Sequence, residues 1–227
     1  YLVFSEYSDG NKTRYRMSKS INGPWITPAD DSFDGRAYYA ARTAFDGERR
    51  VLFGWVPTRD EGGDPSSYLW GGTFMPLEIV QRADGTLGTK LPDSMLGAFG
   101  EAKAVEAFEL SCESGKVEQV LAADAGSTYM LDADIELAGD AAGFSVKLAE
   151  DAESGLAYEF RANLREGKLE FTAAPQYPWF QVNNMGLERP LFFKGEGTHH
   201  VRLVVDDDIA TIFVDDVALN ARFCNKQ

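Results

Sequence analysis

The sequence predicts an all-β protein in two parts, and three observations support this fold class. Short apolar, β-branched and aromatic runs recur between clusters of Gly, Asp, Asn and Pro, a pattern typical of strands and turns. Asp46-Gly47 and Asp84-Gly85 are dipeptides that favour β-hairpin turns. Small and acidic residues at helical spacing occur at Asp93–Phe108. We therefore expect two β domains, residues 1–97 and 98–227, with a short helical linker at the start of the second.

The first residues predict a pair of antiparallel strands. Tyr1–Tyr7 is a strand-like run, Ser8–Asn11 is a turn, and Thr13–Ser18 alternates as a return strand. Ile21–Pro28 then forms a loop around Gly-Pro-Trp. Glu6, a carboxylate within the first strand, is interpreted as an ordinary strand residue and not as a catalytic acid.

The stretch that follows holds the candidate functional residues. Ala37–Phe45 and Arg50–Val56 are apolar and aromatic without clean alternation, so both faces of these two strands are expected to be buried. A loop over Pro57–Tyr68 leads to a third strand that opens on Trp70-Gly71-Gly72. Asp34 precedes the first of these strands, so an acid and flat aromatic rings are expected at the rim of a cleft.

The second part predicts a β-sandwich. Its strands alternate and are separated by Gly and Asp turns, which is the pattern of two packed antiparallel sheets. This part is long enough for a core of its own, and we expect it to fold alone. The expected strands are Val117–Ala122, Thr128–Leu137, Gly143–Ala149, Leu156–Ala162, Lys168–Ala173, His200–Val205, Ala210–Val214 and Ala218–Phe223.

Composition excludes several classes of partner. The chain has 227 residues, with 22 Lys and Arg against 36 Asp and Glu, so its formal net charge is −14. An acidic chain without a basic cluster argues against nucleic acid and against an anionic membrane as partners. No apolar run approaches the roughly 20 residues needed to cross a bilayer. The sequence holds no metal-binding, phosphate-loop or serine-hydrolase motif, and we expect no metal and no cofactor.

The start of the chain indicates a fragment. Tyr1–Phe4 is already strand-like, and natural proteins rarely begin inside a strand, so we expect residues upstream of Tyr1 in a longer protein. Whether that protein is cytoplasmic or secreted stays open.

Several motifs, taken in order, resemble glycoside hydrolase family 32, the β-fructosidases. The resemblance lies in an acid before an aromatic-Tyr-Ala strand (Asp34, then Tyr38-Tyr39-Ala40), and in a strand that ends in Gly-Trp (Gly54-Trp55). It continues in a Trp-small-Gly segment that leads to a Pro and an acid (Trp70-Gly71-Gly72, then Pro76-Leu77-Glu78). The family usually has Arg where this chain has Leu77, so one charged contact of the family is expected to be absent.

The resemblance implies an architecture and an activity. Residues 1–97 would be the last blades of a five-bladed β-propeller, and residues 98–227 the β-sandwich that follows it. The parent protein would be a glycosidase that hydrolyses fructofuranosyl bonds of sucrose or a fructan-type carbohydrate. The family's Asn-Asp-Pro, Arg-Asp-Pro and Glu-Cys motifs are absent from this sequence. The catalytic residues should therefore lie in the missing N-terminal blades, and this chain alone should be inactive.

Four residues are candidates for substrate binding: Asp34, Trp70, Tyr38 and Arg42. Asp34 would accept hydrogen bonds from sugar hydroxyls, or alternatively cap its Asp-Gly turn. Trp70 would stack on a sugar ring, or alternatively pack in the core. We expect Arg42 to share a strand face with Tyr38 and line the pocket, unless it is paired structurally.

Two other functions remain open. One is a non-catalytic carbohydrate-binding or structural sandwich module, and the other is a different five-bladed glycosidase of the arabinanase type. Saturable glycan binding by the second part alone would favour the module. The Trp-Gly-Gly segment and the attached sandwich argue against an arabinanase-like enzyme.

Overall fold

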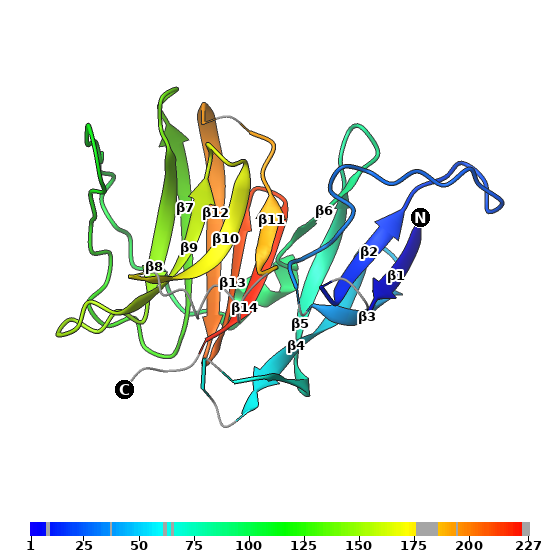
Figure 1. Cartoon of the computed structure of the whole chain (residues 1–227), viewed down its shortest axis with the longest axis horizontal. Coiled ribbons are helices and arrows are strands. Elements are labelled where there is room, and N and C mark those ends of the chain that lie inside the picture. The colour runs from blue at the N-terminus through cyan, green and yellow to red at the C-terminus, as the bar shows by residue number, and fades with distance from the viewer. Residues whose placement is uncertain are drawn as a thin grey trace.

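The computed structural model describes residues 1–7, 10–36, 38–60, 63–64, 66–175, 186–193 and 195–223, without the side chains of residues 68 and 70–73. The fold is all-β, as the sequence predicts (Figure 1). No helix in these ranges is both long and apolar enough to span a bilayer.

A hairpin and a four-stranded sheet make up the first part of the chain. We call the antiparallel pair β1-β2 the N-terminal hairpin and the sheet of order β3-β4-β5-β6 the meander sheet. The turn between β3 and β4 forms as expected, because the Asp46 side chain accepts the backbone N–H of Arg49 at 2.7 Å and Gly47 adopts a positive φ of 105°. The strands are β1 (Leu2–Glu6), β2 (Lys12–Arg16), β3 (Tyr39–Phe45), β4 (Arg50–Arg59), β5 (Tyr68–Gln81) and β6 (Leu87–Lys90).

The second part is a sandwich of two antiparallel four-stranded sheets. The outer sheet has the order β11-β10-β9-β8, and the inner sheet has the order β14-β13-β12-β7. Their strands are β7 (Thr128–Leu137), β8 (Gly143–Leu148), β9 (Ala157–Asn163), β10 (Lys168–Ala174), β11 (Glu188–Pro190), β12 (Gly197–Asp206), β13 (Ile209–Val214) and β14 (Val217–Arg222). Seven of these match the expected strands to within a few residues; β11 was not predicted.

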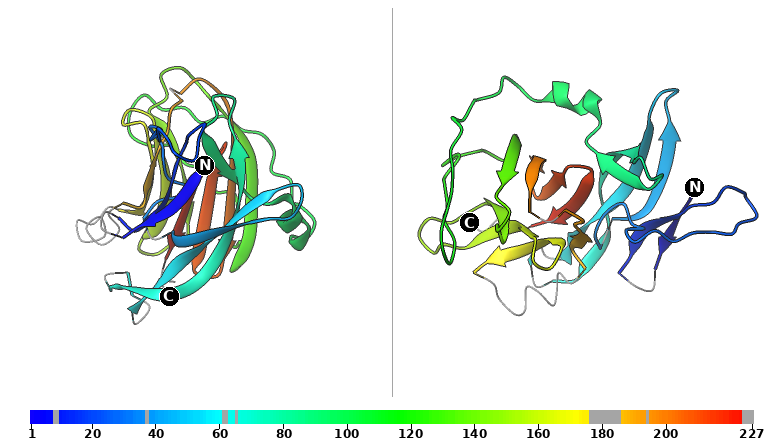
Figure 2. Two further views of the ribbon diagram at one scale, coloured as in Figure 1. Left: turned by 90° about the vertical axis from the view of Figure 1, so that its right-hand side faces the viewer. Right: turned by 90° about the horizontal axis from the view of Figure 1, so that it is seen from above.

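The inner sheet lies between the outer sheet and the meander sheet, as Figures 1 and 2 show. One of its faces packs on the outer sheet through residues such as Leu203 and Ile212. Its other face contributes Val204, Ile209 and Phe213 to a second core that it shares with Leu52 and Leu77 of the meander sheet. All six residues of β13 are therefore buried, which is why this strand lacks a polar face.

Two expected elements differ in the structure. The linker is a short 3-10 helix, η2 (Asp93–Ala98), and does not extend to Phe108. The strand expected at Val117–Ala122 is wrong, because residues 99–127 contain no strand or helix and run along the margin of the molecule (Figure 2, right). Residues 100–127 are exposed. The apolar spacing at Val117–Ala122, which predicted a strand, therefore has no packing partner among the described residues.

Candidate functional site

Asp34 lies in the interior, between the meander sheet and the inner sheet. Its side chain is 1% exposed. One carboxylate oxygen accepts the backbone N–H of Gly35 at 2.5 Å and that of Asn220 at 2.9 Å, and the other accepts the side-chain amide of Asn220. We expected Asp34 at the rim of a pocket; the structure shows its carboxylate joined to β14, far away in the sequence.

The environment of Asp34 affects its ionisation. Burial raises the pKa of Asp34 from 3.8 to about 6, while the hydrogen bonds from Asn220 and the charge of Arg189 act in the opposite direction. A carboxyl group with a strongly raised pKa is often found at functional sites, but structural networks also produce such shifts. Here the bonds of the carboxylate connect two parts of the same chain.

Tyr38 is buried against the backbone of the meander sheet. Its hydroxyl donates to the carbonyl oxygen of Met75 at 2.5 Å and accepts the N–H of Gly54 at 3.0 Å. A Cβ atom at position 54 would lie 2.3 Å from the Tyr38 ring, so only glycine fits beneath it. Burial raises the pKa of the Tyr38 hydroxyl well above its usual value. Gly54 of the Gly-Trp motif is thus explained by the ring that lies over it.

Arg42 does not share a face with Tyr38, and that expectation is wrong. Tyr39 pairs with Trp55 and Arg42 pairs with Phe53, with a β-bulge between them at Ala40, whose φ is +52°. The extra residue of the bulge places Tyr39 and Arg42 on the same side of the sheet. The Arg42 side chain is exposed, and its guanidinium donates to the carbonyl oxygen of Ala41 at 3.2 Å.

The two expected tryptophans lie on neighbouring strands. Trp55, on β4, is half-buried, and its ring centroid lies 4.5 Å from that of Phe74. Trp70 lies in β5, and its side chain is outside the described part of the chain. The structure therefore brings Asp34 and Tyr38 together in the interior, while Arg42 lies on the opposite, exposed side of the meander sheet.

Sequence reasoning missed the polar contacts that join the two parts of the chain. Arg189 of β11 is buried and donates to Asp30 at 2.7 Å, to the Ser32 carbonyl at 2.7 Å and to the Ala218 carbonyl at 2.9 Å. Arg82 forms a two-pronged ion pair with Asp216, at 2.6 and 2.8 Å. Asn220 could have been suspected, because it is an amide that directly follows the apolar residues Val217, Ala218 and Leu219 of its strand.

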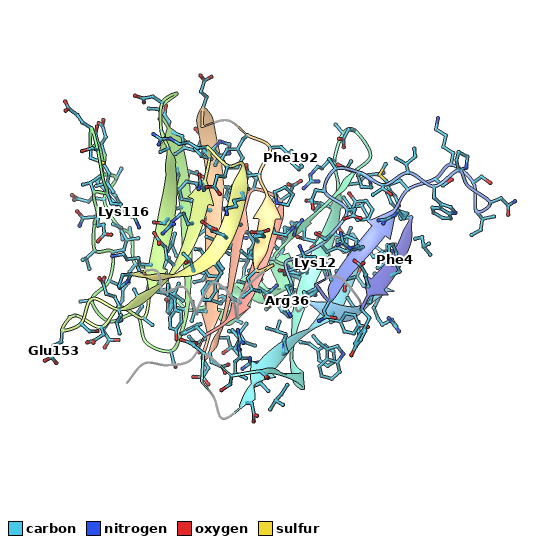
Figure 3. All side chains as sticks on the ribbon, in the orientation of Figure 1. Phe4, Lys12, Arg36, Lys116, Glu153 and Phe192 are labelled. Carbon is cyan, nitrogen blue, oxygen red and sulfur yellow. The ribbon has the colours of Figure 1, made fainter. Side chains whose placement is uncertain are left out.

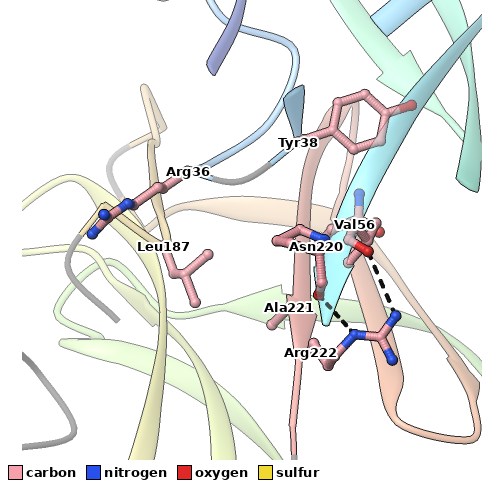
Figure 4. A pocket seen from close by; sticks show the side chains of 8 residues that line it. Arg36, Tyr38, Val56, Leu187, Asn220, Ala221 and Arg222 are labelled. Carbon is pink, nitrogen blue, oxygen red and sulfur yellow. Dashed lines mark hydrogen bonds between the residues drawn. The ribbon is translucent and has the colours of Figure 1, made fainter. Parts of the chain in front are cut away.

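A small pocket opens beside these contacts (Figure 4). It has room for about one water molecule, far less than a sugar ring needs. It is lined by Arg36, Tyr38, Val56, Pro57, Leu187, Asn220, Ala221 and Arg222. Among the residues that the structure describes, no group of His, Cys, Asp and Glu could hold a metal ion.

The sequence matches no protein-family model and no curated protein. Solved structures, however, match nearly the whole chain. A glycoside hydrolase family 32 structure from Bifidobacterium adolescentis matches 96% of it with a TM-score of 0.57 and 19% identity. A sucrose-6-phosphate hydrolase from Lactobacillus gasseri matches 95% with a TM-score of 0.66 and 19% identity.

An exo-inulinase from Aspergillus awamori matches 95% of the chain with a TM-score of 0.65 and 14% identity. The chain has the fold found in these glycoside hydrolases. The resemblance to family 32 that the motifs indicated is thereby confirmed at the level of the fold. The chain spans 33%, 43% and 45% of the three solved chains, respectively, so more than half of each lies outside the match.

Proposed function

We propose that these residues are the C-terminal part of a β-fructosidase that hydrolyses fructofuranosyl bonds of sucrose or a fructan. The observation that carries the proposal is the order of a meander sheet followed by a packed β-sandwich. This order matches a sucrose-6-phosphate hydrolase and an exo-inulinase over 95% of the chain. In this proposal, the N-terminal hairpin and the meander sheet belong to the last blades of a propeller.

The catalytic carboxyl groups would come from residues upstream of Tyr1. A retaining glycosidase needs a nucleophile and an acid/base whose carboxyl groups are about 5–5.5 Å apart. Three buried aspartates of the described residues are engaged elsewhere: Asp30 binds Arg189, Asp34 binds Asn220, and Asp64 accepts the hydroxyl of Tyr158 at 2.7 Å. We infer that residues 1–227 alone are inactive.

The four candidate residues would contribute in two different ways. Asp34 and Tyr38, which lie in the interior, would position the start of β3 by binding the inner sheet and the meander backbone. Trp70 and Arg42 would be the groups able to meet a substrate in the complete enzyme. Of these, Trp70 is the stronger candidate, since a flat indole next to two glycines suits stacking on a sugar.

The test compares residues 1–227 with the longer protein encoded by the same reading frame, using release of fructose from sucrose and inulin. We expect activity from the longer protein and none from residues 1–227. In the active enzyme, Trp70→Ala should lower kcat/KM by about tenfold, because an aromatic contact contributes up to about 1.5 kcal/mol and 1.4 kcal/mol is tenfold. Trp25→Ala is the matched control, at a loop tryptophan that is 39% exposed.

Three results would contradict the proposal. Fructose release by residues 1–227 alone would disprove the location of the catalytic groups. A longer protein without activity on any fructoside, but with saturable binding of inulin by residues 1–227, would favour the carbohydrate-binding module. Activity on arabinan would favour the other glycosidase class.

A further inference from the structure

The pairing of β4 with β5 is interrupted by a bulge at Trp70-Gly71-Gly72. These three residues of β5 stand opposite the single residue Pro57 of β4, because the pairs on either side are Val56–Thr73 and Thr58–Leu69. Proline has no backbone N–H and cannot donate a ladder hydrogen bond, so within a sheet it is found at edges and bulges. Bulges redirect side chains and are frequent next to active sites. The conformation of this bulge therefore determines how Trp70 is presented.

Arg222 of the sandwich binds the backbone opposite the bulge. Side chains of both parts of the chain meet between the inner sheet and the meander sheet (Figure 3), and Arg222 is the last residue of β14. Its Nε donates to the carbonyl oxygen of Pro57 at 2.7 Å, and one Nη lies 3.5 Å from the carbonyl oxygen of Val56 (Figure 4). The other Nη forms an ion pair with Asp208, and the side chain is only 8% exposed. Because a guanidinium is a rigid fork, these bonds fix β4 at Pro57 relative to the inner sheet.

A second contact fixes the same two strands beyond the bulge. Asp64, in the loop that joins β4 to β5, is 8% exposed and accepts the hydroxyl of Tyr158 at 2.7 Å. Tyr158 belongs to β9 of the outer sheet and is fully buried, with its ring stacked on that of Phe171. The sandwich therefore holds this end of the β4–β5 pair at two points, the backbone opposite the bulge and the connecting loop.

We propose that Arg222 is a positioning residue for substrate binding, which holds the bulge in the conformation that lets Trp70 stack on the sugar. This inference rests on the proposed function, which gives Trp70 that role. It assigns the sandwich a part in substrate binding, although Arg222 itself need not touch the sugar. Arg222 acts through the carbonyl oxygen of Pro57, so its effect on substrate binding depends on Trp70.

The first test observes Trp70 directly. The longer protein is labelled with fluorotryptophan, and the fluorine NMR resonance of Trp70 is identified as the one missing from Trp70→Phe. We expect Arg222→Met to shift or broaden this resonance. The matched control is Arg82→Met, which removes an ion pair with Asp216 across the same contact but away from the bulge. An unchanged Trp70 resonance in Arg222→Met, or an equal change in Arg82→Met, would overturn the inference.

The second test measures how the effect of Arg222 on activity depends on Trp70. Arg222→Met should lower kcat/KM of the longer protein by no more than the roughly tenfold loss expected for Trp70→Ala. In the Trp70→Ala background it should have little further effect, because residues that act through one contact are not additive. Arg82→Met should have the same small effect in both backgrounds. Additive losses from Arg222→Met and Trp70→Ala would mean that Arg222 only stabilises the fold, and would overturn the inference.

Arg222→Lys is the second variant if Arg222→Met does not fold. Lys keeps the charge beside Asp208 but has a single nitrogen, so it cannot reproduce the bonds of the guanidinium to Pro57 and Val56. A Trp70 resonance unchanged in Arg222→Lys would then overturn the inference. An active enzyme whose Trp70 resonance is independent of Arg222 would refute this inference alone. A Trp70 resonance that depends on Arg222, in a protein inactive on every fructoside, would refute only the proposed function.

Discussion

At the residue scale, burial and hydrogen bonding have opposite effects on the pKa of the Asp34 carboxyl group. It is the acid of the family-like motif, and its two oxygens are bound by Asn220 and Gly35. Burial nevertheless raises its pKa to about 6. Because the folded pKa lies above the unfolded value of 3.8, the folded chain holds a proton that the unfolded chain loses between these pH values.

The resulting prediction is a pH dependence of stability with a defined sign. The contribution of Asp34 is fully present below pH 3.8 and is lost as the pH rises through about 6. Between pH 4 and pH 7, the unfolding free energy of the wild type should therefore fall relative to that of Asp34→Asn by about 2–3 kcal/mol, since one pKa unit is worth about 1.4 kcal/mol. Urea unfolding at both pH values measures this difference.

Asp46→Asn is the contrasting control for this measurement. Asp46 is fully exposed, and the N–H groups of Arg49 and Glu48 lower its pKa to about 2. Its contribution is therefore present above the usual Asp pKa and is lost only as the pH falls toward 2. If the wild type and Asp34→Asn had parallel pH profiles, the raised pKa of Asp34 would be disproved.

At the scale of one element, β4 depends on close contact between Tyr38 and the strand backbone at Gly54. The Tyr38 ring fills the place that a side chain at position 54 would take, and its hydroxyl binds the main chain of β4 and β5. This contact fixes which face of β3 turns toward the core. The bulge at Ala40 then places Tyr39 and Arg42 together on the face of the meander sheet that points away from the inner sheet.

We predict that Gly54→Ala destabilises the chain by about 1–3 kcal/mol, because the added methyl group overlaps the Tyr38 ring and forces it to move. Gly100→Ala is the control, since no atom lies within 4 Å of the Cβ it would add. Thermal unfolding followed by circular dichroism measures both changes. A Gly54→Ala protein as stable as Gly100→Ala would show that the Tyr38 ring is not held in this place.

At the scale of the whole molecule, the inner sheet joins the two parts into one unit. Its second face buries Val204, Ile209 and Phe213 against the meander sheet, and Arg189 adds a buried ion pair with Asp30 across the same contact. Residues 98–227 alone would expose these apolar side chains, each worth about 1.5–3 kcal/mol when buried. The sequence predicted that the sandwich folds alone. From this shared core we now expect residues 98–227 to fold together with the first part of the chain.

Arg189→Met tests this coupling. It leaves Asp30 as a buried charge without its partner, so we expect a loss of about 3–5 kcal/mol in unfolding free energy. Arg49→Met removes an exposed ion pair with Asp46 and should leave the unfolding free energy almost unchanged. Near-ultraviolet and far-ultraviolet circular dichroism in urea should show one shared transition in the wild type. Two separate transitions would mean that the parts fold independently.

The sequence by itself determined the all-β class and most of the strands, because alternation and turn dipeptides act over a few neighbouring residues. The expected Thr128–Leu137 is the observed β7, and Asp46-Gly47 forms the predicted turn. The order of motifs around Tyr38, Trp55 and Trp70 also pointed to the fold that the solved structures share.

Only the tertiary structure decided which faces are covered and which residues meet. Asp34 and Asn220 are 186 positions apart, and no local pattern encodes their bond. The bulge at Ala40 reverses the face of Arg42, since one additional residue changes the side toward which every later side chain points. Val117–Ala122 has strand-like spacing but pairs with no strand among the residues that the structure describes. A strand needs a partner, and long-range packing alone decides whether one is present.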